Sequence, residues 1–242
     1  LSLLTEQGEV TVDELAKRFE TSEVTIRKDL AALESNGLLL RRYGGAITMP
    51  HELVSDPAQP VSLYKQAIAR AAVGLIKEHA RIIIDSGSTT ASMIPQLGLQ
   101  PGLVVMTNSL HVANALCELE HEPVLLMTGG TWDPHSESFQ GQVAEQVLRS
   151  YDFDQLFIGA DGIDLLRGTT TFNELLGLSR VMAEVAREVI VMVESDKIGR
   201  KIPNLELPWS SVHTLITDDR LPLEAREQIQ ARGITLLCAA LS

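Results

Sequence analysis

Apolar residues in the first part of the chain recur at the spacing of α-helices and are interrupted by short polar breaks. One helical pattern stops at Gly8, and a second begins at Thr11, where Glu14 three residues later completes a capping box. Ser22 is the expected N-cap of a third helix, which we predict to run to about Ser35. The apolar positions of these segments are Leu1, Leu3, Leu4, Val12, Leu15, Ala16, Phe19, Ile26, Leu30 and Leu33. Two short helices joined by a tight turn are typical of a helix-turn-helix.

The third predicted helix has two faces of different chemistry. Ile26, Leu30 and Leu33 fall within a narrow arc and must face a core. The opposite side, together with the N-cap, presents the residues that we assign to DNA contacts: Ser22, Val24, Thr25, Arg27 and Lys28. A valine between cations suits a major groove, where it can touch a thymine methyl group while the cations meet phosphates or guanine edges. The alternative is a plain amphipathic helix in a three-helix domain.

After a predicted helix end at Asn36–Gly37, residues 38–47 contain two short extended stretches around an arginine-rich turn. This pattern predicts a β-wing, in which Arg41, Arg42 and Tyr43 would lie along the phosphate backbone of DNA. The alternative is a surface hairpin that carries two charges. The helix that precedes it favours the wing.

The order of these segments resembles a known family. The runs at residues 10–16, 22–30, 37–39 and 42–46 are similar to the DNA-binding domain of DeoR-type repressors of bacterial sugar operons. Lys28 stands where a second arginine is frequent, and Tyr43 stands where histidine is common. Both keep the character of the position, although a lysine cannot form the bidentate guanine contact of an arginine.

Composition and charge leave this interpretation open. The 242 residues carry a net charge of −12, but 45% are hydrophobic and 21% charged, as in ordinary globular proteins. Residues 1–50 hold six lysines and arginines against eight acidic residues, and most of the basic groups fall in the second half of that segment.

The chain shows no signal for a membrane, a metal or a cofactor. No apolar run approaches the roughly 20 residues that span a bilayer, and no signal peptide is recognisable, so we expect no membrane partner. The six histidines are dispersed, and Cys117 and Cys238 lack metal-type spacing. We therefore expect buried free thiols, no metal site and no cofactor.

The remainder of the chain alternates apolar runs with helical segments. Residues 49–60 contain three prolines and no periodicity, which predicts a linker between a domain at residues 1–48, incomplete at its N-terminus, and a domain at residues 61–242. A helix is expected from Tyr64 to Glu78. The apolar runs that follow are predicted strands: 81–84, 103–106, 124–127, 156–158 and 189–193. We therefore predict an α/β fold, with a small winged helix-turn-helix joined to a larger α/β domain that has a mostly parallel sheet.

All five predicted strands end in small, hydroxylated or charged residues. Ligands of open α/β sheets bind beyond the carboxyl ends of the strands, so these ends predict one polar pocket. The sharpest element is Ser86–Thr90, just before a helix expected over Ala91–Leu97, whose amide and hydroxyl groups would cradle a phosphate. Lys197, at another strand end, would supply the countercharge. The alternatives are an ordinary Ser/Thr-rich helix cap and a solvated lysine.

These strand ends resemble the effector domain of the same DeoR family, which is itself similar to sugar-phosphate isomerases of the ribose 5-phosphate type. The resemblance implies that the Ser86–Thr90 loop and Lys197 hold a phosphate, and that Asp161, with Asn173 and Glu174, faces the sugar. The implied effector-binding residues are Asp85, Ser86, Gly87, Ser88, Thr89, Thr90, Asn108, Gly129, Asp161, Asn173, Glu174 and Lys197. The run Thr170–Glu174 suggests a subgroup that includes glucitol- or hexosamine-linked regulators.

Because the predicted pocket is similar to that of an isomerase, the alternative is that the chain is a sugar-phosphate isomerase with an accessory DNA-binding domain. Isomerisation needs a carboxylate base, which Asp161, Asp164 or Glu174 would supply. The isomerase pattern also has a lysine shortly after the aspartates, and Arg167 occupies that stretch here. An arginine cannot exchange protons near neutral pH, so we expect a sensor and not an enzyme.

Pattern and resemblance together predict a cytoplasmic transcriptional repressor of a sugar-metabolism operon. Its partners would be double-stranded operator DNA and a phosphorylated sugar. Because paired half-sites match two-fold symmetric proteins, we expect a homo-oligomer, either a dimer or a tetramer. The stretch at residues 130–141 is either a lid over the pocket or a surface loop.

Overall fold

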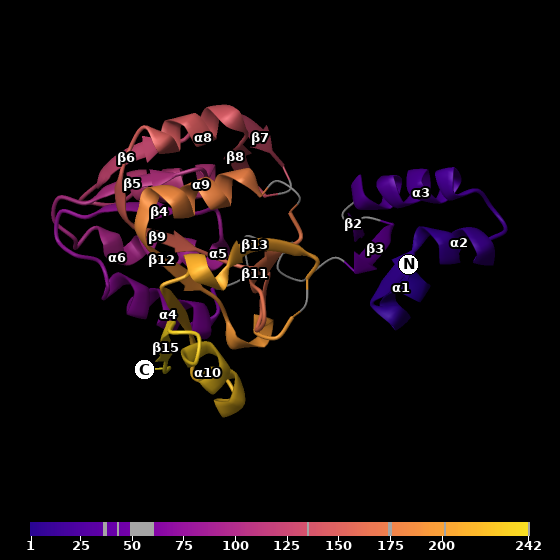
Figure 1. Ribbon diagram of the computed structural model, residues 1–242. Helices are drawn as coiled ribbons and strands as arrows, with labels where there is room; N and C mark the ends of the chain where they lie inside the picture. Colours follow the sequence, from indigo (N-terminus) through magenta and orange to yellow (C-terminus); the bar gives the residue numbers. More distant parts are fainter. Residues whose placement is uncertain are drawn as a thin grey trace. The chain divides into compact units, whose positions relative to one another are not determined.

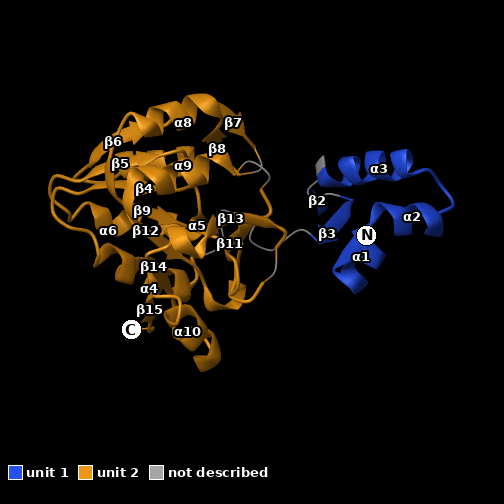
Figure 2. Cartoon of the chain, viewed as in Figure 1, with its two compact units in different colours: residues 1–60 blue, residues 61–242 orange. Residues whose placement is uncertain are grey.

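The chain divides into two compact units, residues 1–60 and residues 61–242 (Figure 2). The computed structural model describes residues 1–35, 38–42, 44–48, 61–134, 136–173, 176–200 and 202–241. The linker predicted at residues 49–60, the helix end predicted at Asn36–Gly37, and the site residues Tyr43 and Glu174 lie outside the described residues, as does the side chain of Arg42.

The N-terminal unit combines three helices with a three-stranded antiparallel sheet (Figure 1). Its elements are α1 (Ser2–Gln7), β1 (Glu9–Thr11), α2 (Val12–Arg18), α3 (Glu23–Ser35), β2 (Leu39–Arg42) and β3 (Gly45–Thr48). The three predicted helices and the hairpin of the wing are confirmed. The sequence pattern did not reveal β1, which pairs with β3 and completes the sheet in the order β1-β3-β2.

Local chemistry explains where these elements begin and end. Gly8 adopts a left-handed conformation with φ of 78° and ends α1. The predicted capping box of α2 is confirmed, because the Thr11 hydroxyl accepts from Glu14 N and the Glu14 carboxylate accepts from Thr11 N, both at 3.2 Å. A side chain on Gly45 would collide with the carbonyl oxygen of Val10, so glycine lets β3 approach β1. The core of the unit is formed by Leu4, Val10, Val12, Leu15, Ile26, Leu30, Leu39 and Ala46.

The second unit is built on a parallel sheet of seven strands in the order β15-β14-β12-β9-β4-β5-β6. The strands are β4 (Arg81–Ile84), β5 (Val104–Thr107), β6 (Val124–Met127), β9 (Phe153–Ile158), β12 (Ala186–Met192), β14 (Thr214–Asp218) and β15 (Thr235–Ala239). All five predicted strands belong to it, and β14 and β15 extend it at one edge. The predicted α/β fold with a mostly parallel sheet is confirmed.

Helices cover both faces of this sheet (Figure 1). They are α4 (Leu63–Val73), α5 (Ser88–Ala91), α6 (Ile94–Leu97), α7 (Leu110–Cys117), α8 (Gln142–Arg149), α9 (Gly177–Val185) and α10 (Leu223–Gln230). Successive residues of a strand point to opposite faces. Ile82 and Ile84 therefore pack with α4, α6 and α7, whereas Ile83 belongs to the cluster with α8 and α9. No helix in the described part of the chain has both the length and the apolar character needed to cross a membrane.

Three sequence-based expectations were wrong in detail. The helix predicted over Tyr64–Glu78 ends at Val73, because the chain leaves the helix at Gly74 and continues in turns. The helix expected over Ala91–Leu97 is two separate helices, α5 and α6, and Pro95 lies in the first turn of the second. Cys117 is exposed and not buried, since it ends α7 away from the face that carries Val112 and Leu116.

Two smaller antiparallel sheets complete the unit. One has the order β10-β11-β13, formed by β10 (Gly162–Asp164), β11 (Gly168–Thr171) and β13 (Asn204–Pro208). The other is the hairpin of β7 (Thr131–Asp133) and β8 (Ser138–Gln140), in which the Trp132 and Phe139 rings meet edge to face at 5.4 Å. The stretch that the sequence left open is thus largely a hairpin, which a bridge between Ser138 and Ser109 joins to the end of β5.

Candidate functional site

The carboxyl ends of five neighbouring strands lie along one edge of the main sheet. Because β12, β9, β4, β5 and β6 are parallel and adjacent, the segments that follow them come together there. These segments hold most of the residues that the sequence assigned to an effector. Asn173 reaches the same region from the end of β11, in the smaller antiparallel sheet.

The loop from Asp85 to Thr90 is shaped by its own last residue. The hydroxyl of Thr90 is completely buried, and its hydrogen is shared between the carbonyl oxygens of Gly87 at 2.6 Å and Asp85 at 2.9 Å. Gly87 lies against Gly159, since an added Cβ would be 3.8 Å from the Gly159 Cα. The Ser88 side chain is exposed. Thr90 and Gly87 therefore set the form of the loop, and Ser88 is the hydroxyl open to a ligand.

Lys197 brings a buried positive charge to this loop. It belongs to a 3-10 turn over Ser195–Lys197 after β12 and is only 8% exposed. Its Nζ donates to the carbonyl oxygen of Ala160 at 3.3 Å, next to Gly159. Within the described residues, no carboxylate lies at ion-pair distance from it. An ammonium group withdrawn from water without a counterion is costly, so this position favours an anionic ligand.

Asp85, the first residue of that loop, lies near the buried amide of Asn108, which follows β5. Burial raises the pKa of Asp85, and Ser86 and the nearby Asn108 amide partly offset this rise. Asn108 is 1% exposed, and its amide is near enough to Asp85 to affect that pKa, but neither amide atom has a partner at full hydrogen-bond geometry within the described part of the chain. A buried amide with such incomplete hydrogen bonding is rare in proteins and is available to a polar ligand.

Glu206, on β13, is a buried carboxyl group that the sequence did not indicate. It accepts hydrogen bonds from Ser179 Oγ at 2.8 Å and Thr169 Oγ1 at 3.3 Å. Burial, together with the negative charges of Asp85 and Asp161, raises its pKa to about 8. No strand-end motif marks residue 206, because only the pairing of β13 with β11 brings it to the site. Among the described residues, no group of three or more His, Cys, Asp or Glu could hold a metal ion.

The two aspartates after β9 have different environments. Asp161 Oδ2 accepts from Thr171 Oγ1 at 2.7 Å and from Phe172 N at 3.0 Å, which ties it to the end of β11. Asp164 is paired with Arg167 at 2.6 Å. Burial by itself would raise the pKa of Asp164, but hydrogen bonds from Arg167 and the Leu166 amide lower it below the ordinary value. Asp164 therefore stabilises the β10–β11 turn.

Asn173 and Gly129 approach the strand ends through their backbones. The backbone N–H of Asn173 donates to Thr171 Oγ1 at 3.0 Å, and the backbone carbonyl oxygen of Asn173 accepts from Asn204 Nδ2 at 3.1 Å. Gly129 has φ of 59°, and a Cβ added there would meet nothing within 4 Å. Its conformation, and not crowding, is the reason for glycine at this position.

The predicted DNA-binding residues of α3 are exposed. Ser22 Oγ accepts from Thr25 N at 3.1 Å, which confirms the N-cap. Val24 is 72% exposed, a high value for an apolar side chain. Arg27 is engaged by Glu23 at 2.6 Å, and no partner of Lys28 occurs among the described residues. In the wing, Arg41 is held by Glu34 at 2.7 Å.

A winged helix-turn-helix together with an α/β unit that has polar strand ends defines the class of DNA-binding regulators with a sensor domain. Residues 1–51 match the model of the DeoR-like helix-turn-helix domain, and residues 62–219 match that of the DeoR C terminal sensor domain. The chain belongs to the DeoR family of transcription regulators.

Relatives that match most of the chain are named as transcription regulators or repressors. The chain is 39% identical to the putative aga operon transcriptional repressor of Escherichia coli O157:H7, over 97% of this chain and 89% of that protein. It is 29% identical to the HTH-type transcriptional regulator GlpR of Haloferax volcanii, over 98% and 94% of the two chains. It is 28% identical to the HTH-type transcriptional regulator IolR of Bacillus subtilis, over 88% and 86%.

Solved structures give a more distant likeness. Ribose 5-phosphate isomerase A of Methanocaldococcus jannaschii covers 55% of this chain and 53% of its own, with 23% identity and a TM-score of 0.41. A likeness of this extent carries no argument about activity.

Proposed function

We propose that this regulator represses a sugar-metabolism operon and that a phosphorylated sugar, bound at the carboxyl ends of the main-sheet strands, changes its affinity for operator DNA. The observation that carries the proposal is Lys197, a buried cation without a carboxylate partner in the described residues, beside a loop of small and hydroxylated residues. A phosphate group would compensate that charge and accept hydrogen bonds from the loop.

The other assigned residues fit a sugar phosphate around this anchor. The phosphate would lie against the backbone of Ser86–Ser88 and the Ser88 hydroxyl, with Thr89 and Thr90 holding the loop. The incompletely hydrogen-bonded Asn108 amide, Asp85 and Asp161 would bind hydroxyl groups of the sugar. Gly129, Asn173 and, by resemblance, Glu174 would border the same ligand.

The DNA side of the mechanism uses α3 and the wing. Val24, Thr25 and Arg27 would contact base edges in the major groove from the Ser22 cap onward. Lys28, Arg41, Arg42 and Tyr43 would contact the phosphate backbone. Arg27 and Arg41 form ion pairs with Glu23 and Glu34 in this structure, so the base edges or phosphates that they bind would have to compete with those carboxylates.

Repression in response to a ligand requires two states. The sugar phosphate must bind the DNA-incompetent state more tightly, because equal binding to both states transmits nothing. We propose a homodimer or homotetramer, since paired recognition helices match palindromic operators. The names of the relatives, such as the aga operon repressor, support repression. We place the protein in the cytoplasm, where its operator would be.

We propose a sensor and not an isomerase because of Arg167, which stands where the isomerase pattern has a lysine. Its guanidinium group is bound to Asp164 and donates to the carbonyl oxygen of Ile202 at 2.8 Å. It can neither exchange protons at neutral pH nor leave the turn without breaking these contacts. A coupled assay with pentose and hexose phosphates should show no turnover, whereas turnover that Asp161→Asn abolishes would establish the enzyme.

The experiment that tests the proposal is binding of the chain to the DNA upstream of its own gene, at fixed salt, with a panel of pentose, hexose, hexitol and amino-sugar phosphates. The salt must be constant because phosphate contacts make affinity steeply salt-dependent. We expect specific binding that one phosphosugar relieves and that Lys197→Met makes insensitive to that sugar. Absence of specific binding under every condition would refute the proposal.

A further inference from the structure

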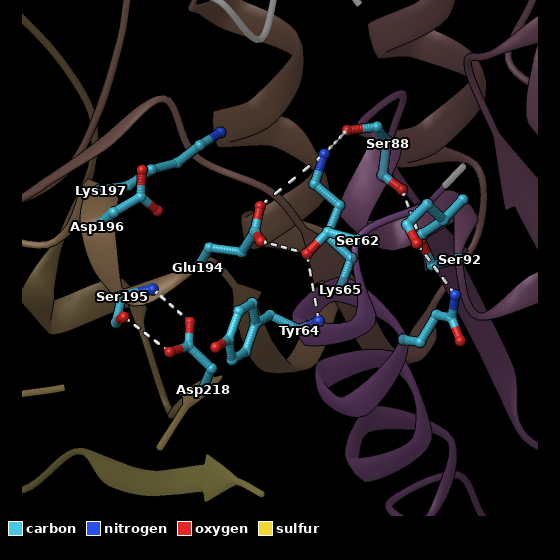
Figure 3. A network of polar contacts seen from close by, with 12 residues as sticks. Ser62, Tyr64, Lys65, Ser88, Ser92, Glu194, Ser195, Asp196, Lys197 and Asp218 are labelled. Atoms are coloured by element: carbon cyan, nitrogen blue, oxygen red, sulfur yellow. Dashed lines mark hydrogen bonds and ion pairs between the residues drawn. The ribbon is translucent and has the colours of Figure 1, made fainter. Parts of the chain in front are cut away.

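The first turn of α4 lies against the proposed anion site (Figure 3). Lys65 Nζ donates a hydrogen bond to Ser88 Oγ at 3.1 Å and lies 3.9 Å from Glu194 Oε2. The side chains of Lys65 and Glu194 are 19% and 16% exposed, so solvent screens this pair less than an ordinary surface ion pair. No sequence motif marks Lys65, which belongs to an amphipathic helix and not to a segment that follows a strand.

Glu194 connects Lys65 to the cap of α4. Its Oε1 accepts from Ser62 Oγ at 2.9 Å, and the same hydroxyl oxygen accepts from Tyr64 N at 3.2 Å. Ser62 is therefore both the N-cap of the helix and a partner of Glu194. Val61, which follows the predicted linker directly, is fixed to this turn because its carbonyl oxygen accepts from Gln66 Nε2 at 3.0 Å.

A second chain of contacts joins the same two regions through Arg220, and Figure 3 shows its first part, between Ser195 and Asp218. Asp218, at the end of β14, accepts from both N and Oγ of Ser195 at 2.8 Å. Arg220 pairs with Asp218 at 2.7 Å, and its guanidinium carbon lies 3.6 Å from the centre of the Tyr64 ring. The segment that carries Lys197 is thus attached to the first turn of α4 on two sides.

An anion bound at Ser88 would change the balance of charge around Lys65. Within the described residues, Glu194 is the one carboxylate at ion-pair distance from Lys65, and 3.9 Å is too long for a hydrogen bond. A phosphate group carries about −1.5 to −2 charges at neutral pH and forms short hydrogen bonds with ammonium groups. It would draw Lys65 away from Glu194 and at the same time repel the Glu194 carboxylate.

We propose that Lys65 is a ligand of the effector's phosphate group, and that Lys65, Glu194 and Ser62 transmit its binding to the point where the linker enters residues 61–242. The inference rests on the proposed function, because it uses the same anion site. In the anion-bound state Glu194 releases Ser62 Oγ, and the first turn of α4 loosens. The response then begins at Val61, beside the linker, without any rearrangement of the main sheet.

The test of Lys65 as a ligand uses the full chain and inorganic phosphate as the probe. Lys65→Met removes the charge and keeps a good helix former, while Lys77→Met removes an exposed lysine of the same unit as a matched control. Calorimetry should show a Kd for phosphate that rises about tenfold or more in Lys65→Met and stays at the wild-type value in Lys77→Met. Equal affinities in all three proteins would overturn the assignment.

The test of transmission is amide hydrogen exchange in the first turn of α4. Saturating phosphate should accelerate exchange at Tyr64, whose amide Ser62 caps, in the wild-type chain. Glu194→Gln keeps an acceptor for Ser62 but is not repelled by an anion, so it should bind phosphate at least as tightly and show no acceleration. A wild-type exchange response in Glu194→Gln would overturn the transmission route.

Lys197→Met separates this inference from the proposed function. If Lys197→Met loses phosphate binding and Lys65→Met does not, the anion site stands and the role of Lys65 is wrong. If the wild-type chain does not bind phosphate, or Lys197→Met binds it as well as wild type, the anion site itself is wrong and both proposals fail.

Discussion

Asp218, Glu206 and Lys197 are buried charged residues that differ in how their charge is compensated. Burial by itself raises the pKa of Asp218, but hydrogen bonds from Arg220 and Ser195 outweigh it and lower that pKa to about 2. Burial and the negative charges of Asp85 and Asp161 raise the pKa of Glu206 to about 8, and the hydrogen bonds from its neutral donors offset only part of this rise. Lys197 has only a carbonyl oxygen among the described residues. Complete compensation indicates a structural role, and incomplete compensation indicates a place for a ligand.

Glu206→Gln should change how stability depends on pH. From about 4.5 to about 8, folded Glu206 holds a proton that the unfolded chain releases, so stability that is fully present below this range is lost as pH rises through it. Glutamine stays neutral and can keep the contacts with Ser179 and Thr169. We expect the variant to match wild type at the acid end and to be more stable, by on the order of 5 kcal/mol, above pH 8.

Urea unfolding across this pH range measures the effect. Glu120→Gln, which alters an exposed glutamate of the same unit, should run parallel to wild type. Parallel curves for Glu206→Gln as well would show that the folded chain does not hold that proton.

At the scale of single elements, α3 and the wing present cations that glutamates of the same unit already engage. The Arg27–Glu23 pair is exposed on both sides, at 57% and 49%, so it contributes little to stability. Arg41 makes a closer attachment, since Glu34 accepts from both its Nε and its backbone amide. If these cations contact DNA as proposed, Arg27 would therefore leave its carboxylate partner at a smaller cost than Arg41.

Replacing Arg27 by alanine should weaken specific operator binding by about 1–3 kcal/mol while leaving folding almost unchanged. Lys17→Ala is the matched control, because Lys17 forms a similar exposed pair with Asp13 on α2. Fluorescence anisotropy at fixed salt, with thermal unfolding alongside, measures both quantities. An unchanged operator affinity in Arg27→Ala would show that α3 is not the recognition helix.

The start of α2 depends on one side chain. Thr11→Ala removes the hydroxyl that accepts from Glu14 N and donates to the Glu14 carboxylate, and it leaves only the bond from the backbone N of residue 11, which should cost about 1 kcal/mol of the stability of that helix. Hydrogen exchange of the α2 amides measures the change. Thr5→Ala serves as control, because the Thr5 hydroxyl bonds only weakly to Leu1 O at 3.4 Å. Equal effects of the two substitutions would contradict a role for the cap.

At the scale of the whole molecule, the chain has separate cores. The cluster of the first unit consists of residues up to Ala46, and two further clusters lie on the two faces of the main sheet. A ligand of one unit can therefore stabilise that unit directly, whereas any effect on the other must pass through the chain that joins them.

A saturating sugar phosphate should stabilise residues 61–242 and leave the stability of residues 1–60 nearly unchanged in the absence of DNA. At about one hundred times its Kd, a ligand adds about 2.7 kcal/mol to the state that binds it. Hydrogen exchange resolved along the chain measures both units at once, and Lys197→Met should remove the effect. Protection confined to residues 1–60 would place the ligand elsewhere.

Many elements of this architecture could be predicted from the local pattern of apolar and polar residues. The inward face of α3 at Ile26 and Leu30, the capping box at Thr11 and the five strands with polar ends all follow from periodicity and neighbours within a few residues. Because the carboxyl ends of parallel strands lie at the same edge of a sheet, the position of Ser86–Thr90 and Lys197 at that edge was also predictable.

Other features required contacts between distant parts of the sequence. Glu206 enters the site because β13 pairs with β11, and Lys65 meets Ser88 because α4 packs against the sheet. The hydroxyl of Thr90 resembles a ligand group in the sequence, yet the folded loop turns it toward its own carbonyl oxygens. The sequence alone determined the three helices and the wing of the first unit, five strands of the main sheet, their order and the family, because periodicity, caps and turns act over a few residues. The tertiary structure decided which polar groups are buried, paired or left for a ligand, because burial and charge compensation depend on residues that only folding brings together.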